Sequence, residues 1–210
     1  MSEASEKQII LFADPMCSWC WGFSPVMGGL ARANDGRARF SLVLGGLQPG
    51  TTDAMTEHAK ADVRHHWEDV AATTGQPFTF DFFDRDGFVY DTEPACRATV
   101  AVRRLAPQSV FPYLEALHRA FYVDNQDVTD RAVLSAVAVS RGLDAVDFAA
   151  AFDSDATRAE TLGDFRAARE LGVTGYPTVV LRDERGLAAL TIGYQPLEAL
   201  VEPLETWLAE

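Results

Sequence analysis

Hydrophobic residues recur along this chain with two different periods, one typical of strands and the other of helices. An unbroken apolar run predicts a buried strand over residues 8–13, and alternating apolar residues predict a second strand over 39–44. Toward the C-terminus, strand patterns return over 178–182 and 187–192, and the polar turn between them predicts a hairpin. Apolar residues at helical spacing then predict a final helix over 197–208, with one face available to cover a sheet.

Helical spacing dominates the middle of the chain. A helix is predicted over residues 18–33, and Pro25 inside it removes a backbone hydrogen bond and predicts a kink. Between the second and third strands the pattern predicts a long, mostly helical block. Its helices are expected at residues 55–74, 93–106, 109–122, 129–141, 145–152 and 157–171.

Residues 76–90 follow neither period, yet they hold a cluster of phenylalanines among acidic residues. These rings can pack on the core or line a cleft, and core packing is the interpretation that we favour. The cluster consists of Phe78, Phe80, Phe82, Phe83 and Phe88. With 48% apolar residues among 210, the chain has enough material for a substantial core.

The sequence Cys17-Ser18-Trp19-Cys20 lies between the first predicted strand and the first predicted helix. A strand followed by Cys-x-x-Cys at a helix N-terminus is the context in which this motif indicates redox chemistry. Unpaired backbone N–H groups and the positive end of the helix dipole favour a thiolate at Cys17, which we expect to be the nucleophile. Cys20 lies about one turn later and is expected to be more buried, which suits a resolving thiol.

Two cysteines at this spacing also occur in zinc sites and as inert core residues. A structural zinc site needs four ligands, but the chain offers one further cysteine and four histidines, none at a paired ligand spacing. His65 and His66 are adjacent, so on a helix they point about 100° apart and do not readily share a metal. We therefore expect neither a metal site nor a bound cofactor, with electrons carried by the Cys17–Cys20 pair itself.

The net charge of −13 argues against nucleic-acid backbones and anionic membranes as partners, since no basic patch interrupts the acidic balance. The first residues lack the basic and apolar regions of a signal peptide, and no apolar run is long enough to span a bilayer. We expect a cytoplasmic protein. In that reducing compartment three cysteines do not form a structural disulfide framework, so the motif is expected to be catalytic or redox-sensing.

Three segments resemble the DsbA family of thiol–disulfide oxidoreductases. Residues 14–21, Asp-Pro-Met-Cys-Ser-Trp-Cys-Trp, look like the active-site segment of the family's cytosolic FrnE-like members. Pro25, five residues after the second cysteine, matches the kink proline of active-site helices in thioredoxin folds. Residues 172–178, Gly-Val-Thr-Gly-Tyr-Pro-Thr, resemble the family's loop whose proline, here Pro177, is cis and lies against the Cys-x-x-Cys motif.

This resemblance implies an α/β thioredoxin fold with a large all-helical insertion. Residues 1–54 and 172–210 would form the thioredoxin-like domain, and residues 55–171 the insertion. Cys17 would attack a substrate disulfide and Cys20 would resolve the mixed disulfide. The implied partners are protein or small-molecule thiols and disulfides, with glutathione as a candidate electron donor and disulfide isomerisation as a candidate further activity.

Trp19, Tyr176 and Pro177 are the residues expected to bind substrate. Trp19 and Trp21 would give the cleft an aromatic rim, although Trp21 can equally pack beneath the helix. A proline that begins a strand lacks an N–H, so Pro177 would leave the backbone of Tyr176 free to pair with an incoming peptide. Without the resemblance, an ordinary trans proline would be the expectation.

Some positions depart from the family's strongly oxidising members or have two interpretations. Those members carry a histidine between the cysteines, whereas this chain has Ser18 and Trp19, so we expect only moderate activation of Cys17. Asp14 could relay protons or oppose thiolate formation, or simply be a turn residue before a proline. Cys96, in the first turn of a predicted helix, is expected to be a small buried apolar residue, with a third thiol near the active site as the alternative.

Two other function classes share parts of this pattern. Kappa-class glutathione transferases and hydroxychromene-carboxylate isomerases resemble the same insertion-bearing fold, but they typically carry serine where Cys17 stands. A binding module without catalytic activity would be expected to lack one of the two cysteines. Because both are present, a thiol–disulfide oxidoreductase is favoured, with a glutathione-dependent isomerase or transferase as the alternative.

Overall fold

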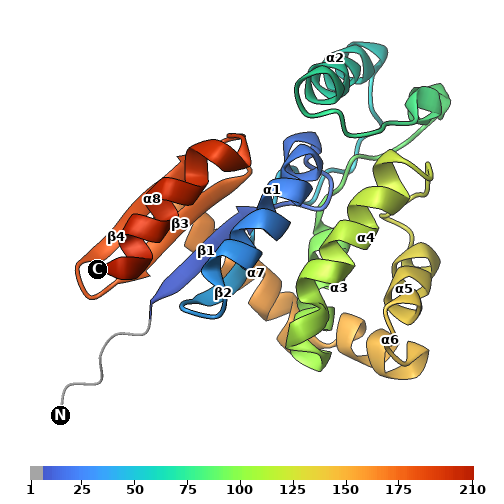
Figure 1. Cartoon of the computed structure of the whole chain (residues 1–210). Helices are drawn as coiled ribbons and strands as arrows, with labels where there is room; N and C mark the ends of the chain where they lie inside the picture. The colour runs from blue at the N-terminus through green and yellow to red at the C-terminus, as the bar shows by residue number, and fades with distance from the viewer. Residues whose placement is uncertain (1–6) are drawn as a thin grey trace.

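The computed structural model describes residues 7–210 and consists of one sheet with helices around it (Figure 1). Its first elements are β1 (Gln8–Ala13), α1 (Ser18–Asn34), β2 (Arg39–Leu44), α2 (Glu57–Thr74), the 3-10 helix η1 (Phe80–Asp84), α3 (Glu93–Leu105) and the 3-10 helix η2 (Pro107–Ser109). The remaining elements are α4 (Val110–Tyr122), α5 (Arg131–Ser140), α6 (Ala145–Asp153), α7 (Asp155–Glu170), β3 (Thr178–Asp183), β4 (Gly186–Ile192) and α8 (Leu197–Ala209).

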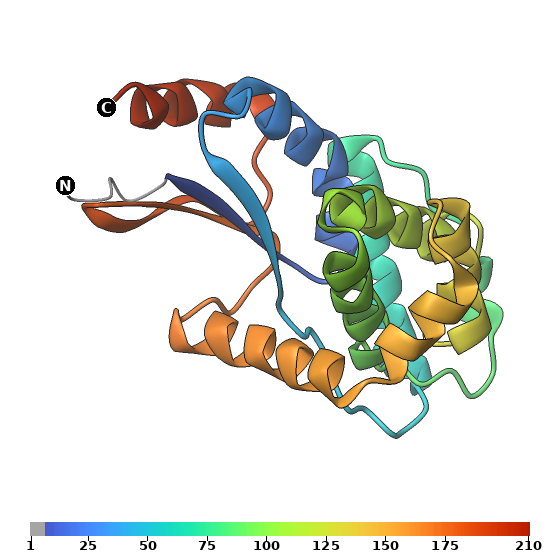
Figure 2. The ribbon, with the colours of Figure 1, turned by 90° about the horizontal axis from the view of Figure 1, so that it is seen from below.

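The sheet has the strand order β2-β1-β3-β4. β1 pairs in parallel with β2 and antiparallel with β3, and β3 and β4 form the predicted hairpin. Successive side chains of β1 point to opposite faces of the sheet. Ile9 and Leu11 pack in the core under α1 and α8, whereas Ile10 and Phe12 contact Ala168 of α7. Figure 2 shows α1 and α8 on one side of the sheet and α7 on the other.

The helices between β2 and β3 enclose a second hydrophobic core beside the sheet (Figure 1). Trp67 of α2 is fully buried there and contacts several rings of the aromatic segment. α7 follows these helices in the chain but contacts β2 and the sheet. The boundaries proposed for the insertion, 55 and 171, stay a prediction.

The elements coincide closely with those predicted. The strands over 8–13 and 39–44 have the predicted bounds, and every predicted helix is present with ends displaced by at most two residues. Pro25 lies inside α1, which runs from Ser18 to Asn34. Core packing of the aromatic segment is confirmed, because Phe82, Phe83 and Phe88 are buried in the second core.

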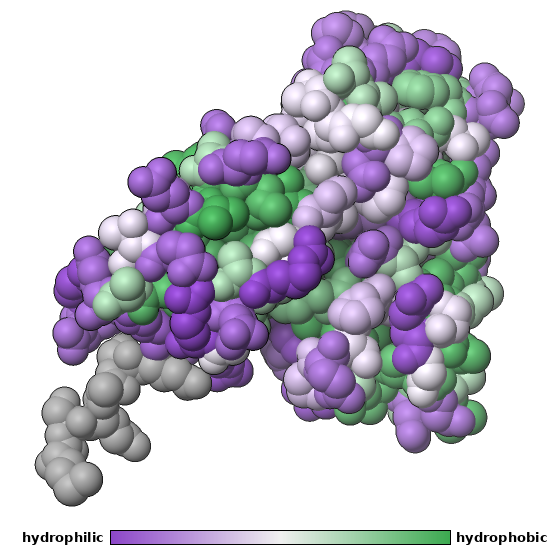
Figure 3. Space-filling view, in the orientation of Figure 1, coloured by the Kyte–Doolittle hydropathy of each residue, from purple (hydrophilic) through white to green (hydrophobic). Residues whose placement is uncertain are grey.

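Hydrophilic residues cover much of the surface in the view of Figure 3, and hydrophobic residues gather where α8 lies beside α1. None of the helices in the described part of the chain combines the length and the apolar character needed to cross a bilayer.

Candidate active site

Cys17 occupies the N-cap position of α1, at the carboxyl end of β1. Its backbone is extended, with φ −93° and ψ 115°, and its carbonyl oxygen accepts hydrogen bonds from the N–H groups of Cys20 and Trp21. The N–H of Cys17 donates to the carbonyl oxygen of Asp14, which closes a turn between the strand and the helix. The thiol therefore lies where the helix dipole favours negative charge, as the sequence predicts.

Cys20 lies in the first turn of α1, behind Cys17. Both cysteines are free thiols and both are buried, with 6% of Cys17 and 4% of Cys20 exposed. The expected difference in exposure is thus small, but only Cys17 lines the cleft described below. Burial raises the pKa of the Cys20 thiol well above its ordinary value, and the adjacent Cys17 raises it further. Cys20 is therefore held as a neutral thiol next to Cys17.

The loop before β3 lies against Cys17, although 159 residues separate them in the chain. The Tyr176–Pro177 peptide bond is cis, as predicted. The Cys17 thiol donates a hydrogen bond of 3.5 Å to the carbonyl oxygen of Tyr176. Within residues 7–210 the backbone N–H of Tyr176 has no hydrogen-bond partner, so it is available to a bound chain.

Two glycines after β2 lie in close contact with aromatic side chains, Gly45 with Tyr176 and Gly46 with Phe165. A Cβ atom at Gly45 would overlap the phenol ring, so this close approach requires glycine. The Tyr176 hydroxyl donates a 2.8 Å hydrogen bond to the carbonyl oxygen of Gly45. Gly46 has a φ of +69°, and a Cβ atom there would press on the ring of Phe165. The loop after β2 therefore holds one wall of the cleft in place.

A cleft of about 270 Å³ opens beside Cys17 and is enclosed by the thioredoxin-like elements and α2. Trp19 and Tyr176 bring aromatic rings to it, and Trp19 also packs on Tyr194 with ring centroids 5.9 Å apart. The full lining consists of Met16, Cys17, Ser18, Trp19, Leu47, Gln48, Val63, His66, Tyr90 and Tyr176. A thiol in a partly apolar cleft next to an open backbone N–H can form a mixed disulfide with a peptide or small thiol.

Asp14 is fully buried beneath the two cysteines. One carboxylate oxygen accepts from the N–H of Met16 at 2.9 Å, which makes Asp14 a turn residue. The other accepts from the N–H of Leu47 at 2.7 Å and from the thiol of Cys96 at 3.4 Å. Burial raises the pKa of Asp14, and these hydrogen bonds oppose the rise. A hydrogen bond to the backbone of Asp14 lowers the pKa of Cys20, and the charge of Asp14 raises it. A role of Asp14 in relaying protons or opposing thiolate formation stays a prediction.

Cys96 is fully buried in the same hydrophobic cluster as Cys17 and Cys20. Burial raises the pKa of its thiol well above the ordinary value, and the charge of Asp14 raises it further. It is therefore both a buried residue, as expected, and close to the residues beneath the active site.

Side chains from the segment between β2 and β3 form hydrogen bonds with the backbone of the active-site loop. Tyr90 donates its hydroxyl to the carbonyl oxygen of Met16. His118 of α4 places Nε2 3.3 Å from the carbonyl oxygen of Asp14 and Nδ1 3.3 Å from Ser24 Oγ. Burial lowers the pKa of His118 to about 4, so its imidazole is neutral near pH 7 and can donate from Nε2 to the carbonyl.

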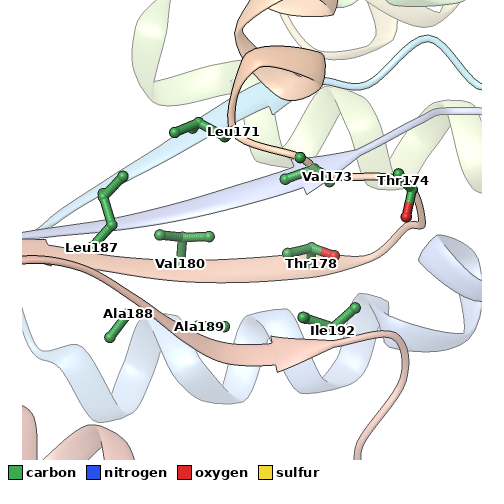
Figure 4. Close-up of a pocket in the computed structure, with 10 residues that line it drawn as sticks. Leu171, Val173, Thr174, Thr178, Val180, Leu187, Ala188, Ala189 and Ile192 are labelled. Atoms are coloured by element: carbon green, nitrogen blue, oxygen red, sulfur yellow. The ribbon is translucent and has the colours of Figure 1, made fainter.

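A second groove, of about 240 Å³, lies along β3 and β4 (Figure 4). Val180 and Thr178 form its floor in this view, between Leu171 of the preceding loop and Ile192 of β4. No thiol and no ionisable side chain lines it. Within residues 7–210, no three His, Cys, Asp or Glu side chains are grouped so as to hold a metal ion. The cleft beside Cys17 is therefore the candidate active site.

The structure brings most of the predicted site residues together. Cys17, Trp19 and Tyr176 line the cleft, and Pro177 follows Tyr176 directly. Of the two places predicted for Trp21, the cleft rim and the position beneath the helix, the structure shows the second. Trp21 is buried and stacks on Tyr122 with the ring planes 7° apart. Their roles in catalysis and substrate binding stay predictions.

The sequence patterns did not predict the residues that α2 and the loop after β2 contribute to the cleft. Val63 and His66 lie on α2, and Leu47 and Gln48 follow the glycine pair. No local pattern marks any of them, because only the packing of α2 against the thioredoxin-like elements brings it beside Cys17. Gly22 of α1 reflects this packing, because a Cβ atom there would meet Val70 of α2.

Comparisons with known proteins agree with this geometry. A family model described as a DSBA-like thioredoxin domain matches residues 8–205. A solved structure from Nitrosomonas europaea, of a protein proposed to be a protein disulfide isomerase, is 39% identical, covers 97% of this chain and 98% of its own, and has a TM-score of 0.89. The cytosolic disulfide reductase DsbM from Pseudomonas aeruginosa is 28% identical, with coverage of 96% and 98% and a TM-score of 0.80.

DsbM has also been solved with GSH, and that structure has a TM-score of 0.78 to this chain. Among curated proteins, the ClpXP adapter protein SpxH from Halalkalibacterium halodurans is 25% identical over 209 residues, which cover 96% of this chain and 67% of the adapter. The family model spans nearly the whole chain, and the predicted thioredoxin fold with its high helical content is confirmed. The chain therefore belongs to the DSBA-like thioredoxin domain family and is a thiol–disulfide oxidoreductase.

Proposed function

We propose that this protein reduces disulfides through the Cys17–Cys20 pair, with Cys17 as the nucleophile and Cys20 as the resolving thiol. The observation that carries this assignment is the different access of the two sulfurs: Cys17 lines the cleft at the helix N-terminus, and Cys20 lies behind it. A substrate disulfide entering the cleft reaches Cys17 first. The raised pKa of Cys20 keeps it protonated, so that it does not compete for substrate.

The reaction consists of two thiol–disulfide exchanges. The thiolate of Cys17 attacks one sulfur of the substrate disulfide, a new S–S bond forms, and the other substrate sulfur leaves as a thiolate that takes up a proton. Cys20 then loses its proton and attacks the sulfur of Cys17, which releases the second substrate thiol. The substrate gains two electrons and the protein is left with a Cys17–Cys20 disulfide. Two molecules of a thiol such as glutathione would reduce the pair again and leave as a disulfide.

Substrate would lie across the loop before β3. The free N–H of Tyr176 can donate to a carbonyl group of a peptide, in the manner of a strand added to a sheet edge. The ring of Trp19 would cover the apolar part of the substrate, and Pro177, which lacks an N–H, would leave the backbone of Tyr176 free to pair with the substrate.

A relative supports the proposed direction of electron flow and the proposed location. DsbM, which is 28% identical over nearly the whole chain, is a cytosolic disulfide reductase and has been solved with GSH. We therefore propose a cytoplasmic reductase with glutathione as its electron donor and without a bound cofactor. Isomerisation of disulfides is the second activity of the same pair, since a substrate with a further thiol can resolve the mixed disulfide in place of Cys20.

Two single substitutions test the roles of the cysteines. Cys17→Ser should abolish reduction of a peptide disulfide, because no nucleophile then faces the cleft. Cys20→Ser should keep the attack and lose the resolving step, so that a mixed disulfide through Cys17 accumulates and is seen by mass spectrometry. Cys96→Ala is the matched control and should form no such adduct.

The alternative glutathione-dependent isomerase or transferase would need Cys17 or an equivalent hydroxyl but would have no use for Cys20. Full activity of Cys20→Ser without added thiol would therefore overturn the proposed roles. Titration of the Cys17–Cys20 pair against glutathione buffers gives its reduction potential. A value near that of thioredoxin, about −270 mV, would support a reductase, and one near about −120 mV would support an oxidant instead.

A further inference from the structure

α2 supplies the wall of the cleft that faces the active-site loop, with Val63 and His66. Of all the side chains that line the cleft, only His66 can carry a positive charge. Burial raises the pKa of Tyr176 to about 12 and raises that of Tyr90 as well, so both phenols are neutral near pH 7. The cleft contains no carboxylate, although the whole chain has a net charge of −13.

The other histidines of α2 are paired with carboxylates one turn later. His58 lies 3.5 Å from Asp62, and His65 lies 3.6 Å from Asp69. Asp62 and Asp69 are the two aspartates of α2, and both are therefore paired with histidines other than His66. His66 is exposed, has no ion-pair or hydrogen-bond partner in the described part of the chain, and lines the cleft, about 100° around the helix from His65.

We propose that His66 selects substrates that carry a carboxylate near the reacting disulfide, with glutathione disulfide and glutathione mixed disulfides as the chemical class. An imidazole donates an N–H to a carboxylate when it is neutral and adds a positive charge when it is protonated. The exposed amide of Gln48, on the same cleft, is a second donor within the lining. This inference rests on the proposed exchange at Cys17.

The physical reason for such a residue is the acidic character of the protein. A disulfide with several carboxylates is repelled by a molecule of charge −13. A hydrogen-bond donor at the cleft reduces this electrostatic repulsion where the substrate binds. The Cys-Ser-Trp-Cys loop itself brings no cation to the cleft. The helical block therefore supplies, from α2, the basic group that the motif lacks.

The experiment measures the second-order rate constant with which three disulfides oxidise the reduced protein. The disulfides are glutathione disulfide, which is anionic, hydroxyethyl disulfide, which is neutral, and cystamine, which is cationic. In His66→Gln the rate with glutathione disulfide should fall by up to about fivefold, the upper end of what one solvent-exposed charged contact contributes. The rate with hydroxyethyl disulfide should be unchanged, and that with cystamine unchanged or higher.

Two further variants separate charge from structure. His66→Lys places an ammonium group on the same turn of α2 and should retain the preference for glutathione disulfide over hydroxyethyl disulfide. His65→Gln changes the adjacent histidine, which pairs with Asp69 and does not line the cleft, and should behave as wild type. An equal loss with all three disulfides in His66→Gln, or no change with any, would overturn the role of His66. If hydroxyethyl disulfide fails to oxidise the wild-type pair, the proposed exchange itself is wrong.

Discussion

Asp14 connects the turn before α1 to two other parts of the molecule. Its carboxylate caps the N–H groups of Met16 and Leu47 and accepts the thiol hydrogen of Cys96. Each of these groups is buried or partly buried, so a missing partner would leave a polar group without a hydrogen bond. Cys96 therefore supports the loop that carries Cys17 without facing the cleft.

Replacement of Cys96 by alanine should leave redox cycling intact and lower the free energy of unfolding by about 1–2 kcal/mol. The loss has two causes: a small cavity in the core, and one hydrogen bond fewer to Asp14. Urea unfolding of the reduced protein measures the change. Thiol titration of the folded protein should still find Cys17 reactive, and loss of cycling in this variant would place Cys96 in the active site.

At the scale of elements, Trp67 is the largest buried side chain that holds α2 beside the active site. It is an exposed helix with only Lys60, Trp67 and Val70 buried. Trp67 packs against rings of the aromatic segment and of α4, including Phe83 at 4.8 Å and Tyr122 at 4.9 Å between centroids. Since His66 adjoins Trp67 in the chain, the anchor also positions the wall of the cleft.

Trp67→Ala should lower the free energy of unfolding by about 3–5 kcal/mol, because it leaves a large cavity in the second core. It should also reduce hydrogen-exchange protection in α2 more than in β1, since the sheet has a core of its own. Trp67→Phe keeps an aromatic ring at the site and should have a smaller effect on both. Equal loss of protection in α2 and β1 would show instead that the two cores unfold as one unit.

At the scale of the whole molecule, neutral His118 makes stability depend on pH. Burial lowers its pKa from 6.5 to about 4, so the unfolded chain takes up a proton on acidification before the folded protein does. The free energy of unfolding should therefore fall between about pH 6.5 and pH 4, by up to about 3 kcal/mol from this group. The raised pKa of Asp14 acts in the opposite direction, because protonation on acidification favours the folded state.

His118→Gln removes this titration and keeps an amide that can donate to the carbonyl oxygen of Asp14. Urea unfolding at pH 7.5 and pH 4.5 should show that acidification lowers the free energy of unfolding more in wild type than in the variant. The contributions of the other titrating groups are common to both proteins and cancel in this comparison. His65→Gln, at an exposed position, should follow the wild-type profile. Parallel profiles for wild type and His118→Gln would contradict a neutral buried imidazole.

Local patterns in the sequence determined the elements and the reactive pair. The apolar run at 8–13 and the motif Cys17-Ser18-Trp19-Cys20 predicted a strand, a helix N-terminus and two thiols one turn apart, because period and capping are properties of neighbouring residues. The loop at 172–178 was recognised through a resemblance, and its place against Cys17 was an implication of that resemblance. These positions are close in the structure, where the Cys17 thiol donates a hydrogen bond to the carbonyl oxygen of Tyr176.

Only the tertiary structure decided which distant side chains share the cleft and which lie beneath it. His65 and His66 are adjacent histidines, yet His65 pairs with Asp69 on the helix surface and His66 lines the cleft. The contacts of Asp14 with Leu47 and Cys96 span 33 and 82 residues and depend on how β2 and α3 pack. Side-chain periodicity reports which face of an element is buried, but not what that face packs against. The residues around the dithiol were therefore set by packing between elements, which no local pattern in this chain encodes.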